Sequence, residues 1–100
     1  MIVLHLHGRV PGGGRPALEA FLAEARAFYE APGGIRVRLH WDRADPCRFL
    51  EIMEYADEAA YAADQERVEA DPEMRAWLAR WHALLDGPIA VTVYDDVPVG

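Results

Sequence analysis

The residue types most suited to chemistry occur at alternating positions in the first two predicted strands. His5 and His7 alternate with apolar residues near the N-terminus, and Arg36, Arg38 and His40 do the same in the second strand. Successive side chains of a strand point to opposite faces, so each set would share one face. If the two strands belong to one sheet, imidazoles that exchange protons near neutral pH would lie beside guanidinium groups that bind anions.

Two alternatives to a proton-transfer site follow from the same pattern. His5 and His7, with Glu51 or His40, have the residue types of a transition-metal site. The neighbouring arginines would repel a cation, so we expect no metal there. The histidines and arginines could instead form hydrogen bonds and ion pairs with acidic groups of the same chain or of a second subunit.

Proline, glycine and aspartate divide the chain into seven predicted elements. Pro16 suits the first turn of a helix that runs to about Glu30, and Asp57 and Asp71 are suitable N-cap residues for the next two helices. Gly87 with Pro88 is expected to end the last helix. The predicted strands are 1–9, 35–42, 47–55 and 89–94, and the predicted helices are 16–30, 58–69 and one from 72 that reaches Leu85.

The order strand, helix, strand, strand, helix pair, strand is that of an α+β ferredoxin-like split βαβ sandwich. Right-handed crossovers place the first strand between the third and the fourth, with the second strand outside the third. The helices should cover the face that carries Leu4, Leu6, Val37, Leu39, Leu50, Ile52, Val91 and Val93. The other face would carry Val3, His5, His7, Arg36, Arg38, His40, Phe49, Glu51, Met53, Tyr55, Thr92 and Tyr94. Its mixed, partly apolar character predicts a homodimer in which two such sheets face each other.

Length and composition limit the function classes. A chain of 100 residues with 52% hydrophobic residues predicts a single folded domain, residues 1–100. The net charge of −7 argues against nucleic acid as a partner. There is no apolar run long enough to cross a membrane and no leader sequence, so we expect a cytoplasmic protein. The single cysteine, Cys47, agrees with a reducing compartment.

The segment 49–61, FLEIMEYADEAAY, resembles the third strand and following helix of the antibiotic-biosynthesis monooxygenase family, which belongs to the dimeric α/β-barrel superfamily. Val10-Pro11-Gly12 and Asp71-Pro72 also resemble that family's pattern. The resemblance implies a dimeric α/β barrel. It also implies a small monooxygenase-like enzyme that acts on a planar organic substrate without a tightly bound cofactor. The chain has Met53 where the family often has an acid, and Tyr55 where it often has tryptophan. Asp64 and Gln65 stand near a position where the family often has histidine.

The enzyme hypothesis assigns roles to particular residues. His7 would act as the base, Arg38 would stabilise negative charge and Tyr55 would orient the substrate. The expected substrate-binding residues are His5, Arg36, His40, Glu51, Trp77, Trp81 and His82. For the two tryptophans, packing in the core is the alternative that the sequence favours. The alternative hypothesis is a non-catalytic homodimeric module that binds a ligand or a partner and uses the same groups as inter-subunit ion pairs.

Overall fold

A computed structural model describes all 100 residues and contains the seven elements in the predicted order. None of its helices combines the length and the apolar character that crossing a membrane requires. The elements are β1 (Ile2–Arg9), α1 (Arg15–Glu30), β2 (Ile35–Trp41), β3 (Arg48–Tyr55), α2 (Glu58–Ala70), α3 (Pro72–His82) and β4 (Ala90–Asp95).

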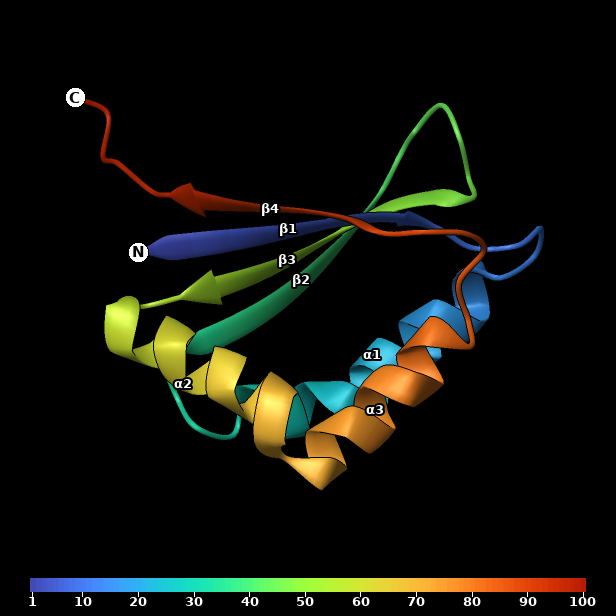
Figure 1. Cartoon of the computed structure of the whole chain (residues 1–100). Helices are drawn as coiled ribbons and strands as arrows, with labels where there is room; N and C mark the ends of the chain where they lie inside the picture. Colours follow the sequence, from blue (N-terminus) through green and yellow to red (C-terminus); the bar gives the residue numbers. More distant parts are fainter.

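The four strands form one antiparallel sheet in the order β2-β3-β1-β4, which confirms the predicted topology. The three helices all lie on one side of this sheet, and the other side is uncovered (Figure 1). We call these the helix side and the open side of the sheet. The fold is therefore the predicted α+β ferredoxin-like sandwich, with β2 and β4 at its two edges.

The helix ends follow the capping residues in the sequence, with one exception. The side chain of Asp57 accepts a hydrogen bond from the backbone N–H of Ala60 at 2.8 Å, and that of Asp71 accepts one from Glu73 at 2.9 Å. Helix α3 ends at His82, earlier than predicted. The next residues form tighter turns, in which Leu84 N–H donates to the carbonyl of Trp81 at 3.0 Å.

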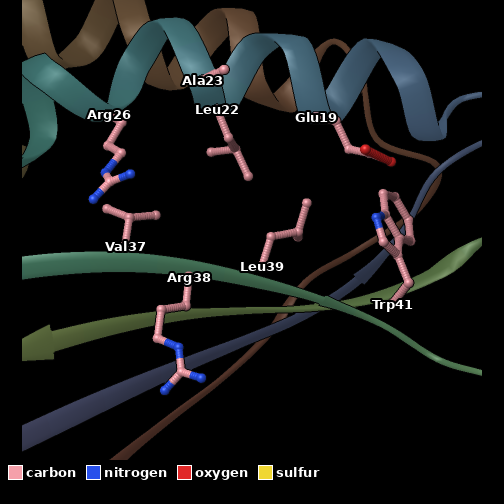
Figure 2. Close-up of a pocket in the computed structure, with 8 residues that line it drawn as sticks. All are labelled: Glu19, Leu22, Ala23, Arg26, Val37, Arg38, Leu39 and Trp41. Carbon is pink, nitrogen blue, oxygen red and sulfur yellow. The ribbon is translucent and has the colours of Figure 1, made fainter.

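The edge strand β2 has the predicted orientation. Val37, Leu39 and Trp41 point toward α1 and line a groove of about 330 Å³, whereas Arg38 points to the open side (Figure 2). The backbone N–H of Val37 points outward from the sheet and donates to the carboxylate of Glu30 at 2.9 Å. This bond satisfies one of the edge groups that could otherwise pair with another strand.

The orientation predicted for β3 was wrong. Leu4 pairs with Met53 and Leu39 pairs with Glu51, and directly paired residues share a face. The residues of β3 on the helix side are therefore Phe49, Glu51, Met53 and Tyr55, all of which are buried. Leu50 and Ile52 lie on the open side and are only partly buried.

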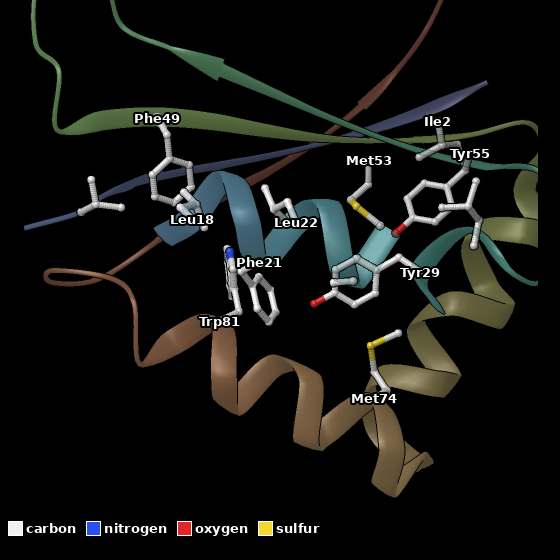
Figure 3. Close-up of a cluster of buried hydrophobic side chains, with 13 residues drawn as sticks. Ile2, Leu18, Phe21, Leu22, Tyr29, Phe49, Met53, Tyr55, Met74 and Trp81 are labelled. Atoms are coloured by element: carbon white, nitrogen blue, oxygen red, sulfur yellow. The ribbon is translucent and has the colours of Figure 1, made fainter. Parts of the chain in front are cut away.

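The hydrophobic core lies between the sheet and α1, and α3 closes it (Figure 3). The apolar residues of α1 recur at helical spacing and form one stripe that faces this core: Leu18, Phe21, Leu22, Ala25 and Tyr29 are buried, and Phe28 is half-buried. Phe49 and Tyr55 from β3 are the largest fully buried side chains. The core residues are Ile2, Val10, Leu18, Phe21, Leu22, Ala25, Tyr29, Ile35, Phe49, Met53, Tyr55, Met74 and Trp81.

Gly8 is required by the packing of Phe49, and the variant Gly8→Ala tests this. A Cβ atom on Gly8 would lie 2.6 Å from Cζ of Phe49, whose side chain is only 1% exposed and cannot move aside. We expect a loss of about 1–3 kcal/mol in the free energy of unfolding, measured by urea denaturation. Gly12→Ala is the control, since nothing lies within 4 Å of its added Cβ. Equal stability of the two variants would contradict this packing.

Candidate functional site

A cavity of about 560 Å³ lies between the helix side of the sheet and the helices. This volume is within the range of small-molecule sites, and most of the lining is apolar. The exposed valines Val91 and Val93 of β4 form one wall. The cavity is lined by Leu4, Leu6, Tyr29, Glu51, Met53, Tyr55, Tyr61, Asp64, Gln65, Val68, Met74, Leu78, Trp81, His82, Gly87, Pro88, Ile89, Val91 and Val93.

Glu51 is buried in this cavity, and no positively charged group compensates it. The residue is 3% exposed, and burial raises the pKa of its carboxyl to about 7. The indole N–H of Trp81 lies near enough to oppose part of that rise. However, Oε1 of Glu51 and Nε1 of Trp81 both lack a partner at hydrogen-bonding geometry. An acid with this pKa takes up and releases a proton at neutral pH, as general acid-base chemistry requires.

Asp64 is a second buried acid in the cavity, but it has partners. The hydroxyl of Tyr55 donates a hydrogen bond of 2.6 Å to Oδ2 of Asp64. The guanidinium of Arg67 lies 3.6 Å from Oδ1 of Asp64 and also donates to the carbonyl of Phe28 at 2.9 Å. Arg67 itself does not line the cavity. Asp64 thus fixes Tyr55, and Arg67 joins α2 to the C-terminal end of α1.

Two tyrosines supply neutral hydroxyl groups to the same cavity. Burial raises the pKa of Tyr55 above its ordinary value, and its hydrogen bond to Asp64 raises the pKa further. Burial also raises the pKa of Tyr29, and the charges of Glu51 and Asp64 add to this rise. Both side chains therefore stay protonated and act as hydrogen-bonding hydroxyls, not as bases.

The histidines and arginines of β1 and β2 share the open side of the sheet, as predicted. The ring of His5 packs at 4.8 Å from that of Tyr94 and at 6.0 Å from that of His7. Arg38 pairs with Glu54 at 3.3 Å, and Arg36 and His40 are exposed.

The predicted catalytic trio of His7, Arg38 and Tyr55 is not assembled, because Tyr55 lies on the helix side of the sheet. Glu51 is on that side too, so it cannot join His5 and His7 as a metal ligand. Leu50 of β3 separates His7 from His40 in the sheet. No group of three or more histidine, cysteine or acidic side chains is arranged to hold a metal ion.

The three residues predicted from the last helix have different environments. Trp81 is buried and lines the cavity, with its indole nitrogen directed toward the sheet (Figure 3). His82 is exposed and lies in the cavity wall. Trp77 does not line the cavity. It packs between α1 and α3, with its ring 5.8 Å from that of Phe28.

Sequence reasoning missed Tyr29 and the pairing of Asp64 with Tyr55. Tyr29 belongs to the apolar stripe of α1. Only its hydroxyl group indicated that it could form a hydrogen bond in the cavity. Asp64 follows Ala62 and Ala63 in α2, a helix that offers no broad apolar stripe. An acid on the buried face of such a helix needs a partner, and that requirement was the available signal.

No family model and no curated protein matches this sequence. Solved structures do match over nearly the whole chain. A provisionally named antibiotic biosynthesis monooxygenase from Deinococcus radiodurans has a TM-score of 0.76 at 15% identity, covering 99% of this chain and 95% of its own. SnoaB, a cofactor-independent oxygenase from Streptomyces nogalater, has a TM-score of 0.76 at 19% identity, covering 98% and 94%.

A protein from a differently named group also has this fold. A NIPSNAP domain protein from Burkholderia xenovorans has a TM-score of 0.72 at 19% identity, covering 97% of this chain and 95% of its own. At such identities these comparisons establish the fold and leave the activity to be argued from the residues of the cavity.

Proposed function

We propose that this chain, which has the fold of the antibiotic-biosynthesis monooxygenases, is a small monooxygenase-like enzyme that acts on a planar organic molecule without a tightly bound cofactor. The observation that carries the proposal is the mostly apolar cavity of about 560 Å³ with Glu51 buried inside it. The structural likeness to SnoaB supports the reaction class. The cavity between sheet and helices replaces the face of His7 and Arg38 as the proposed site.

Glu51 is the proposed base. Its carboxylate takes a proton from an O–H or activated C–H group of the substrate, and negative charge then moves from Glu51 to the substrate. The electron-rich anion is the only reductant and gives four electrons to dioxygen: a ring C–H carbon becomes C=O with one oxygen atom. The other oxygen leaves as water with the two hydrogens that the substrate loses, one of them through Glu51, so that a phenol becomes a quinone. The N–H of Trp81 stabilises the negative charge, and the hydroxyls of Tyr29 and Tyr55 orient the ring.

The activity is tested with Glu51→Gln, which has nearly the same shape but cannot accept the proton. On a panel of quinols, we expect oxygen consumption to fall roughly 100-fold or more in kcat. The wild-type rate should rise with pH, reach half its maximum near the pKa of Glu51 at about 7, and level off roughly one pH unit higher. His7→Ala is the control and should keep the full rate. A Glu51→Gln enzyme with wild-type turnover would exclude this role.

We also propose that the open side of the sheet binds a second copy of the chain. Val3, Leu50 and Ile52 lie at its centre, are only partly buried and do not belong to the hydrophobic core. Arg38 and Glu54 border them and already pair within one chain. A partly apolar face of this kind on one side of a sheet is typical of an interaction surface. If the cavity proves inactive, this dimer is the non-catalytic module of the alternative hypothesis.

Ile52→Arg tests the proposed dimer. A charge at the centre of the open side would be buried without a partner, so we expect at least a roughly 100-fold weaker dimerisation constant. Analytical ultracentrifugation at low micromolar concentration measures it. Ala27→Arg, on the exposed surface of α1, should leave the association unchanged. A monomeric wild-type protein would disprove the dimer, as would a dimer that Ile52→Arg leaves intact.

A further inference from the structure

We propose that the cavity selects its ligand by charge, admitting planar molecules with an uncharged hydrogen-bond donor at the buried end and rejecting carboxylates. This inference concerns the cavity of the proposed function, but it does not require that the cavity is catalytic. It specifies the ligand class that Glu51 and its surroundings accept.

The side chains that line the cavity have an excess of negative charge. Glu51 and Asp64 both line it, and no arginine does. Asp64 is compensated by Arg67 at 3.6 Å and by the hydroxyl of Tyr55 at 2.6 Å. Glu51 has no such cation, so the cavity has one negative charge when this carboxyl is ionised. A carboxylate ligand would bring a second one into a site that water screens poorly.

Two atoms without a hydrogen-bond partner define what the ligand must offer: Oε1 of Glu51 needs a donor, and Nε1 of Trp81 needs an acceptor. Oδ1 of Asp64 also lacks a hydrogen bond, but the guanidinium of Arg67 at 3.6 Å compensates its charge. An uncharged hydroxyl supplies both, because its hydrogen can bond to the carboxyl while its oxygen accepts from the indole. A carboxylate can satisfy Trp81 but offers Glu51 no donor at neutral pH. The remaining lining is largely apolar and aromatic, which suits a flat ring.

The charge state of Glu51 determines how binding depends on pH. The titratable groups that line the cavity from the surrounding elements are Tyr29, Tyr55, Tyr61, Asp64 and His82, besides Glu51 itself. Tyr29 and Tyr55 stay neutral, and Asp64 is paired. Ionisation of Glu51 near pH 7 therefore weakens the binding of an anion and strengthens the bond from a neutral donor.

Isothermal titration calorimetry with 2-naphthol and 2-naphthoate tests the inference, because the two probes differ mainly in the charge of one substituent. At about pH 8 we expect 2-naphthol to bind at least tenfold more tightly than 2-naphthoate. Between about pH 5.5 and 8, the affinity for 2-naphthoate should fall at least fivefold, and that for 2-naphthol should not fall.

Variants separate Glu51 from other causes. In Glu51→Gln the pH dependence for 2-naphthoate should disappear, and its affinity at high pH should exceed that of wild type. Glu66→Gln, which removes an exposed carboxylate of α2 outside the cavity lining, should behave like wild type. The inference is overturned if 2-naphthoate binds as tightly as 2-naphthol, if 2-naphthol does not bind, or if the pH dependence persists in Glu51→Gln. Selective binding without oxygen consumption would instead disprove the proposed activity alone.

Discussion

Replacing Glu51 by glutamine should stabilise the protein by about 3 kcal/mol above pH 7, although it removes the proposed base. Burial raises the pKa of this carboxyl from 4.5 to about 7. Between these values the folded protein holds a proton that the unfolded chain has released. The free energy of unfolding of the wild type therefore falls as the pH rises from about 4.5 to about 7. Above this range, Glu51 causes no further change. Glutamine stays neutral and avoids the loss.

Urea denaturation of both proteins between about pH 4 and 8 measures this difference. The two free energies of unfolding should be similar at the acidic end and should diverge as pH rises. Glu66→Gln provides the control, since Glu66 is an exposed acid of α2 outside the cavity lining. A Glu51→Gln variant that is less stable than wild type at pH 8 would contradict this prediction. It would mean that a neighbouring group stabilises the ionised carboxylate.

The variant Arg67→Met should lose about 3–5 kcal/mol in the free energy of unfolding, because it leaves Asp64 as a buried charge without its cation. Asp64 is 3% exposed, and its Oδ1 lies 3.6 Å from Arg67. Arg67 also donates to the carbonyl of Phe28 at the end of α1 and lies 4.6 Å above the ring of Phe28. Methionine keeps the apolar part of the side chain and removes only the guanidinium.

A double variant isolates the ion pair from the other contacts. Asp64→Asn in the Arg67→Met background removes the unpaired charge, so it should recover part of the lost stability in urea denaturation. Arg80→Met is the control, because Arg80 pairs with Glu24 on the surface, where both side chains are more than half exposed. A loss from Arg67→Met no larger than that from Arg80→Met would show that Asp64 is not a buried charge.

The sequence alone determined the order of the elements, the helix caps and the order of the strands. These features depend on local signals: the proline at the start of α1, the N-cap acids Asp57 and Asp71, and the apolar stripe of α1. The strand order then follows from the handedness of crossover connections, which few sequences violate. The faces of β1, β2 and β4 were also predictable, because in each strand one set of alternating residues is clearly more apolar.

Only the tertiary structure decided which face of β3 is buried, and with it the site. Both sets of alternating residues in β3 are partly apolar, and Glu51 in one set favoured the wrong choice. The turn after β2 sets the register so that Trp41 pairs with Phe49, and a shift of one residue would reverse every side chain of the strand. The core contains Phe49, Met53 and Tyr55. Glu51 is on the same face of the strand, so it is buried in the cavity. The burial that gives Glu51 its pKa is thus a consequence of pairing distant segments, which no local pattern in the sequence encodes.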